Sequence, residues 1–174
     1  MRLLSRVFRA LGVRGRVVHA AATDGSVSFV HAPSPRKALA GVESLGIATS
    51  GPRVRALTVD ALAHEHNLTS VGVDWLTIDT EGWDGLVLRG AKSLLTRRRV
   101  RVLEFEYHGI GPWRTLRLRD TLSWLDGMGY ECFWQGNDGK LAPATTRCNF
   151  EFRSWSNLVC AQEYGLLTAM RRYT

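Results

Sequence analysis

The sequence has few cysteines, and their spacing matches no metal-binding motif. Three of the 174 residues are cysteines, namely Cys132, Cys148 and Cys160. An odd number of distant cysteines without a C-x-x-C pair, in a chain whose start shows no secretory leader, predicts neither a thiolate metal site nor a disulfide framework. We therefore expect reduced thiols and favour a reducing compartment, with a cytoplasmic location.

Long apolar runs and concentrated positive charge are also missing. No apolar stretch approaches the roughly 20 residues that a membrane-spanning helix needs, so no membrane span is predicted. The formal net charge is +7, but the basic residues are scattered, and the run Arg97–Arg99 falls where a helix is expected to end. Aromatic residues do not alternate with the arginines, which argues against nucleic-acid binding. Strong, salt-dependent binding to RNA or DNA would be the mark of that alternative.

The patterns that are present indicate one α/β domain over residues 1–174. With 45% hydrophobic and 22% charged residues, the chain can bury a core. Apolar runs alternate with helical i, i+3, i+4 patterns, which is typical of a mainly parallel sheet covered by helices. Strands are expected at 16–21, 26–30, 53–57 (at a sheet edge), 71–78, 100–106, 130–135 and 156–162, helices at 3–11, 58–67, 83–95 and 117–128, and a long loop at 33–52. The last two strands lack a clear helix between them and should pair antiparallel.

The stretch Trp75–Gly82 is the most informative part of the chain. An apolar strand ends in two carboxylates, Asp79 and Glu81, and a glycine and a helical pattern follow. Ligands of open α/β sheets bind at the carboxyl ends of strands, so both carboxylates should face a crevice. Acidic residues also occur at helix starts simply because they cap the helix and complement its dipole. The local pattern alone leaves both interpretations open.

The strand expected at 100–106 ends in a second polar group. Glu106 and His108 should face the same crevice, where either side chain could accept a proton. A histidine titrates near neutral pH, although a single histidine in a loop is more often simply solvated. No obvious third ligand accompanies Asp79 and Glu81, so no metal site is predicted.

Five segments occur in a recognisable order along the chain. They are Ala-Ala-Ala-Thr-Asp-Gly-Ser-Val at 20–27, Val-Arg-Ala-Leu-Thr-Val-Asp-Ala-Leu at 54–62, Val-Asp-Trp-Leu-Thr-Ile-Asp-Thr-Glu-Gly at 73–82, Val-Leu-Arg-Gly-Ala at 87–91 and Val-Leu-Glu-Phe-Glu at 102–106. The third and fourth resemble the D-x-L-x-I-D-x-E-G strand and V-L-x-G-A helix of FkbM-type methyltransferases. The whole resemblance covers about residues 15 to 162.

The resemblance implies a Rossmann-like class I methyltransferase fold with an antiparallel last strand. It also implies transfer of a methyl group from S-adenosylmethionine to a hydroxyl of an unidentified small molecule or glycan. The implied catalytic candidates are Asp79, Glu81, Glu106 and His108, and the implied cofactor contacts are His19, Ala20, Ala21 and Asp79. The alternative is a methyltransferase-like module that binds a partner without catalysis. The sequence leaves the oligomeric state open.

One part of the family pattern is missing. Class I methyltransferases hold the cofactor with a glycine-rich turn after the first strand, and no G-x-G precedes the strand expected at 16–21. We therefore expect either a domain truncated at its amino terminus, which lacks the first one or two strands and could be inactive alone, or a chain that has lost cofactor binding. The retained polar strand ends favour truncation. Apolar residues of the first helix, such as Val7 and Phe8, should then be unusually exposed.

Overall fold

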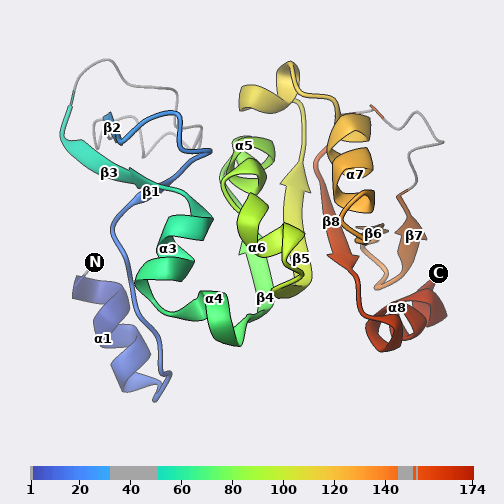
Figure 1. The fold of residues 1–174 in the computed structure, drawn as a ribbon, viewed down its shortest axis with the longest axis horizontal. Coiled ribbons are helices and arrows are strands. Elements are labelled where there is room, and N and C mark those ends of the chain that lie inside the picture. Colours follow the sequence, from blue (N-terminus) through green and yellow to red (C-terminus); the bar gives the residue numbers. More distant parts are fainter. Residues whose placement is uncertain (1, 32–50, 145–150, 152) are drawn as a thin grey trace.

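The residues that the structure describes form two β-sheets with helices between and around them (Figure 1). The structure is a computed structural model that describes residues 2–31, 51–144, 151 and 153–174. Most of the long loop expected at 33–52 lies outside these residues. The helices are α1 (Arg2–Ala10), α3 (Val59–Glu65), α4 (Leu68–Val71), α5 (Asp84–Arg89), α6 (Lys92–Thr96), α7 (Leu118–Asp126) and α8 (Tyr164–Met170), with two 3-10 turns, η1 (Gly111–Arg114) and η2 (Arg171–Tyr173).

The smaller sheet contains three short strands in the order β1-β3-β2. They are β1 (Ala21–Ala22), β2 (Phe29–His31) and β3 (Arg53–Leu57), where β1 is parallel and β2 antiparallel to β3. The bounds predicted for β3 are confirmed, but its position at a sheet edge is wrong, because β3 has a partner on each side. The strand expected at 16–21 is wrong in extent, since only Ala21 and Ala22 pair with β3.

The larger sheet contains five strands in the order β4-β5-β8-β6-β7. They are β4 (Val73–Ile78), β5 (Val100–Tyr107), β6 (Glu131–Gln135), β7 (Leu141–Pro143) and β8 (Ser156–Ala161). β8 lies antiparallel between β5 and β6, which confirms the antiparallel last strand. The expectation of a mainly parallel sheet is not met: only β4 and β5 pair parallel, and the sheet is mixed.

One face of the larger sheet packs against the main core, and the other face carries only a small apolar cluster. The residues of β5 divide between the two faces. Leu103, Phe105 and Tyr107 alternate with polar residues and enter the main core, which contains buried residues of α3, α5, α6 and α7. Val102 points to the opposite face and joins a small cluster with Phe133 and Val159, against which α8 packs. Because residues two apart share a face of a strand, Glu104 and Glu106 lie on the same face as Val102.

The helix expected at 83–95 is two short helices, which are interrupted at Gly90 and Ala91, where Gly90 packs against the backbone of Thr23 just after β1. A Cβ atom on Gly90 would lie 2.2 Å from the carbonyl oxygen of Thr23. The Asp60 carboxylate, from the first turn of α3, accepts the N–H groups of Ser93 at 2.7 Å and Leu94 at 3.0 Å. Asp60 thereby satisfies donors at the start of α6, as an N-cap residue would.

The first helix meets its predicted exposure only in part. Val7 is 40% exposed, as expected. Phe8 is half-buried, because its ring packs over Gly15, where an added Cβ would lie 2.6 Å from a ring carbon. The expected exposure of Phe8 is therefore wrong.

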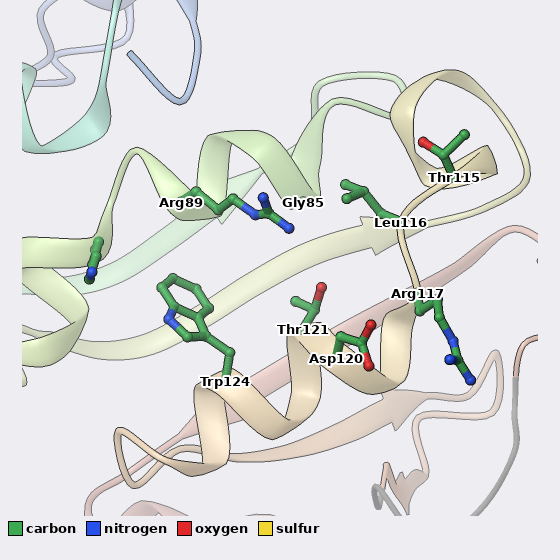
Figure 2. Close-up of a pocket in the computed structure, with 9 residues that line it drawn as sticks. Gly85, Arg89, Thr115, Leu116, Arg117, Asp120, Thr121 and Trp124 are labelled. Atoms are coloured by element: carbon green, nitrogen blue, oxygen red, sulfur yellow. The ribbon is translucent and has the colours of Figure 1, made fainter. Parts of the chain in front are cut away.

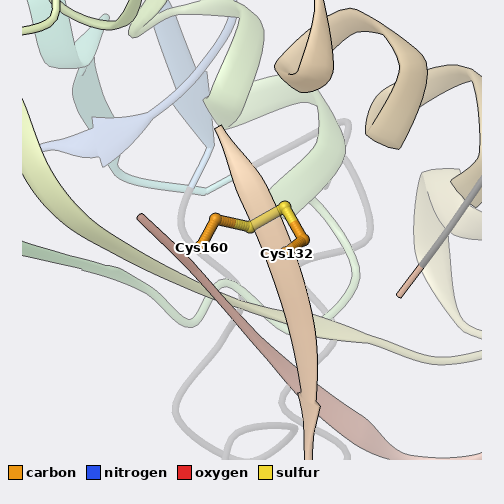
Figure 3. Close-up of a disulfide and its surroundings, with 2 residues drawn as sticks. All are labelled: Cys132 and Cys160. Carbon is orange, nitrogen blue, oxygen red and sulfur yellow. A yellow bond between two sulfur atoms is a disulfide. The ribbon is translucent and has the colours of Figure 1, made fainter. Parts of the chain in front are cut away.

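The expectation of reduced cysteines is also wrong. Cys132 of β6 and Cys160 of β8 form a disulfide, and both residues are buried (Figure 3). They occupy directly paired positions of the two antiparallel strands, with Cα atoms 4.0 Å apart. Sequence spacing could not show this pairing, since it depends on the register between strands 28 residues apart. The structure thus does not support the premise from which a reducing compartment was inferred, and Cys148 lies outside the described residues.

Replacement of Gly90 by alanine should destabilise the fold by about 1–3 kcal/mol, because the added methyl group meets a backbone carbonyl that cannot rotate away. The measurement is urea unfolding followed by circular dichroism. Gly165→Ala is the matched control, since a Cβ there has no heavy atom within 4 Å. Equal stability of the two variants would contradict the close contact between Gly90 and Thr23.

Reduction of the disulfide should lower the free energy of unfolding by about 2–4 kcal/mol, because the bond closes a 28-residue loop in the unfolded chain. Unfolding with and without dithiothreitol measures the effect, and mass spectrometry of the unreduced protein establishes the bond. Cys148→Ser should behave as the parent in both states. Free thiols at both Cys132 and Cys160 after purification in air would contradict the pairing.

Candidate active site at the ends of β4 and β5

A buried carboxylate fixes the turn that follows β4. Asp84 is 0% exposed, and it accepts the N–H groups of Thr80 and Glu106 at 3.4 Å and of Gly82 at 3.2 Å. Burial raises the pKa of Asp84, and these backbone N–H groups oppose the rise. Since Glu106 belongs to β5, the Asp84 carboxylate ties the turn after β4 to the neighbouring strand.

The backbone of the turn takes a conformation that few residues favour. Glu81 has φ +52° and Gly82 has φ +96°, both in the left-handed region. A Cβ on Gly82 would lie 2.5 Å from the carbonyl oxygen of Ile110, so this turn packs directly on the loop after β5. A left-handed non-glycine residue costs about 1–3 kcal/mol, and such strain concentrates at functional sites. The surrounding contacts hold the backbone of Glu81 in this conformation.

The turn and the end of β5 bring three of the predicted residues together. Ligand atoms of Glu81, Glu106 and His108 all lie within 4.8 Å of one another. Nε2 of His108 is 3.3 Å from Oε2 of Glu106, and the side chains are 1% and 14% exposed. Neither of these two atoms has a hydrogen-bond partner among the described residues. We name Glu81, Glu106 and His108 the carboxylate cluster.

The histidine of the cluster is held in one tautomer. The backbone N–H of Ile110 donates to Nδ1 of His108 at 3.2 Å, so Nδ1 bears a lone pair and the ring proton of the neutral imidazole lies on Nε2. Nε2–H then lies beside the Glu106 carboxylate without a hydrogen bond to it. In this tautomer Ile110 occupies the lone pair of Nδ1 and Nε2 carries a proton, so neither nitrogen offers a lone pair to a metal ion or a substrate proton. The geometry therefore favours a positioning role for His108.

One residue of the site carried no signal in the sequence. Trp155 stacks on His108, with ring centroids 4.3 Å apart and planes 14° apart, and its Nε1–H donates to Oε1 of Glu106. It lies one step beyond the Tyr107 and Ser156 pair, where antiparallel pairing of β5 with β8 brings it beside His108. Trp155 comes 49 residues after Glu106, so only the inserted strand reveals the contact.

The remaining predicted residues lie apart from the carboxylate cluster. Asp79 follows β4, is exposed and is not part of the cluster. His19 is exposed, and Ala20 and Ala21 are half-buried, with Ala21 paired to Ala56 in the smaller sheet.

A hollow of about 460 Å³ lies between α5, α6 and α7 (Figure 2). Arg89 extends into it from α5, and Thr121 and Trp124 face it from α7, whereas the side chain of Arg117 points away (Figure 2). No residue of the carboxylate cluster lines this hollow. Glu106 of the cluster shares a face of β5 with Val102, and the opposite face of β5 packs against the core that contains these helices.

Comparison with known protein families shows to which family the chain belongs. A family model of the methyltransferase FkbM domain matches residues 10–132. The chain belongs to the FkbM methyltransferase family. The match includes Asp79, Glu81, Glu106 and His108, and it ends before β8 and Trp155. No curated protein and no solved structure matches the chain. Among the described residues of this FkbM domain, no helix is long and apolar enough to cross a membrane.

FkbM proteins generally depend on S-adenosylmethionine, and the glycine-rich turn of a class I methyltransferase follows the first strand of its sheet. The glycines beside the cluster follow β4 and β5 and have another role. Gly82 and Gly111 close the contact between two loops, since a Cβ on either would meet the backbone of the other loop within 3.2 Å.

Asp84→Asn should lower the free energy of unfolding by about 1–3 kcal/mol, because the amide NH2 would face backbone N–H groups that now donate to a carboxylate. Chemical denaturation compares this variant with Asp126→Asn, which removes an exposed carboxylate. If desolvation of Asp84 outweighs its hydrogen bonds, the asparagine variant will instead be as stable as the parent or more stable.

Proposed function

We propose that this FkbM domain takes part in transfer of a methyl group to a hydroxyl oxygen, and that the carboxylate cluster receives the acceptor hydroxyl. The observation that carries the proposal is the convergence of Glu81, Glu106 and His108 at the carboxyl ends of two parallel strands. Ligands of α/β sheets bind at this edge. Membership of a methyltransferase family supports the reaction type.

The chemistry of the acceptor requires a base or an orienting acceptor. A neutral hydroxyl is a weak nucleophile, and a carboxylate within hydrogen-bond reach assists it by accepting its proton during the reaction. We assign this role to Glu81, because the left-handed backbone of the turn after β4 places this carboxylate in the cluster beside Glu106, whose Oε1 accepts the indole N–H of Trp155. In this proposal, Glu106 and His108 position Glu81 and the acceptor.

S-adenosylmethionine, when bound, would supply the electrophilic methyl group. The proposed contacts of this cofactor remain His19, Ala20, Ala21 and Asp79. The roles proposed for Glu81, Glu106 and His108 concern only the acceptor hydroxyl. The second candidate is a methyltransferase-like binding module without catalysis, which would keep the cluster and bind no S-adenosylmethionine. Isothermal titration with S-adenosylmethionine separates the two: heat of binding supports the enzyme, and its absence in a folded protein supports the module.

Glu81→Gln should reduce methyl transfer by about 100-fold or more, because an amide cannot accept the hydroxyl proton. Incorporation of labelled methyl groups into a panel of hydroxyl compounds measures the rate. Asp126→Asn, which changes an exposed carboxylate on α7 outside the cluster, should keep activity close to that of the parent. The assignment of Glu81 fails if its variant keeps full activity or if Asp126→Asn is equally impaired.

A further inference from the structure

The indole of Trp155 is fixed in place and yet open to solvent. It is 58% exposed, although His108 covers one face and Glu106 binds its N–H. With one face covered and more than half of its area accessible, the opposite face is directed outward. Exposure of a large rigid aromatic face is unfavourable in water, and a ligand that packs on such a face removes it from contact with water.

A comparison within the chain shows what distinguishes this tryptophan. Trp75 is similarly exposed, at 56%, and its Nε1–H donates to Glu104 at 3.1 Å. Among the described ring pairs, however, Trp155 stacks on a neighbouring ring and Trp75 does not. Stacking and the hydrogen bond together fix the plane of the Trp155 indole. The protein therefore loses little side-chain entropy when a ligand packs on this ring.

The surroundings of the open face select the chemistry of its ligand. Glu106 contacts Trp155 directly, and Glu81 lies with Glu106 in the carboxylate cluster. Carboxylates accept hydrogen bonds from hydroxyl groups, while an indole face packs against C–H groups. A saturated ring that carries hydroxyls around its edge and C–H groups on its face satisfies both surfaces at once. A pyranose has this arrangement.

We propose that Trp155 is the platform on which a sugar ring stacks, with a ring hydroxyl directed to Glu81, so that the acceptor of this domain is a glycan or glycoside. This inference rests on the proposed function. Trp155 lies outside residues 10–132, the part of the chain that matches the FkbM family model. A specificity residue is expected in such a segment, because acceptor choice varies while the shared reaction does not.

Binding of methyl pyranosides in the gluco, galacto, manno and rhamno series tests the platform, with saturation-transfer NMR and indole fluorescence on the full chain. We expect at least one glycoside to bind. Trp155→Ala should weaken it about tenfold or more, and Trp155→Phe should weaken it less, because phenylalanine keeps a stacking face and loses only the N–H. Trp75→Phe is the matched control and should bind as the parent does. Circular dichroism establishes that each variant is folded.

Three results would overturn the platform: no glycoside binds, Trp155→Ala binds as the parent does, or choline binds and the glycosides do not. The last result would identify a cation site formed by the indole and the carboxylates. These measurements need neither cofactor nor turnover. Glycoside binding without methyl transfer would leave the platform standing and reject the proposed function, whereas transfer only to hydroxyl compounds without a sugar ring would do the reverse.

Discussion

The Asp84 carboxylate is the interaction on which the site depends. It is fully buried, and its oxygens accept N–H groups from both sides of the turn after β4 and from Glu106 on β5. Burying a charge is expensive unless hydrogen bonds compensate it, and here the compensating donors belong to the backbone that must be ordered. The turn that carries Glu81 and the strand that carries Glu106 must therefore keep these positions, because otherwise the buried Asp84 carboxylate would lose its hydrogen bonds.

Around this carboxylate, the two loops at the sheet edge are packed against each other. Gly82 meets Ile110, and the N–H of Ile110 in turn selects the tautomer of His108. The His108 ring stacks on Trp155, and its Nε2 lies beside the Glu106 carboxylate. The N–H of Ile110 therefore determines that the proton of the neutral ring lies on Nε2, the nitrogen beside the Glu106 carboxylate. Asp84, Gly82 and His108 are thus connected through direct contacts, so that the position of each depends on the others.

The sequence patterns predict which residues lie at the ends of the strands. They do not predict the contacts between the two loops that follow these strands. Apolar runs that end in acids correctly placed Glu81, Glu106 and His108 at strand ends, because parallel neighbours terminate at the same edge. Asp79 was expected beside them, but it is exposed and lies outside the cluster. The single helix expected at 83–95 is broken at Gly90, where the Thr23 backbone leaves no room for a Cβ. Local periodicity contains no information on such contacts between distant segments.

The sequence by itself determined the family, the alternation of strands and helices, and the identity of the acidic strand ends, since these depend on neighbouring residues and on motif order. Only the tertiary structure decided the mixed sheet, the Cys132–Cys160 bond and the stacking of Trp155 on His108. All three follow from the insertion of β8 between β5 and β6. Strand insertion and register arise from packing across the whole sheet, and no local pattern along the chain records them.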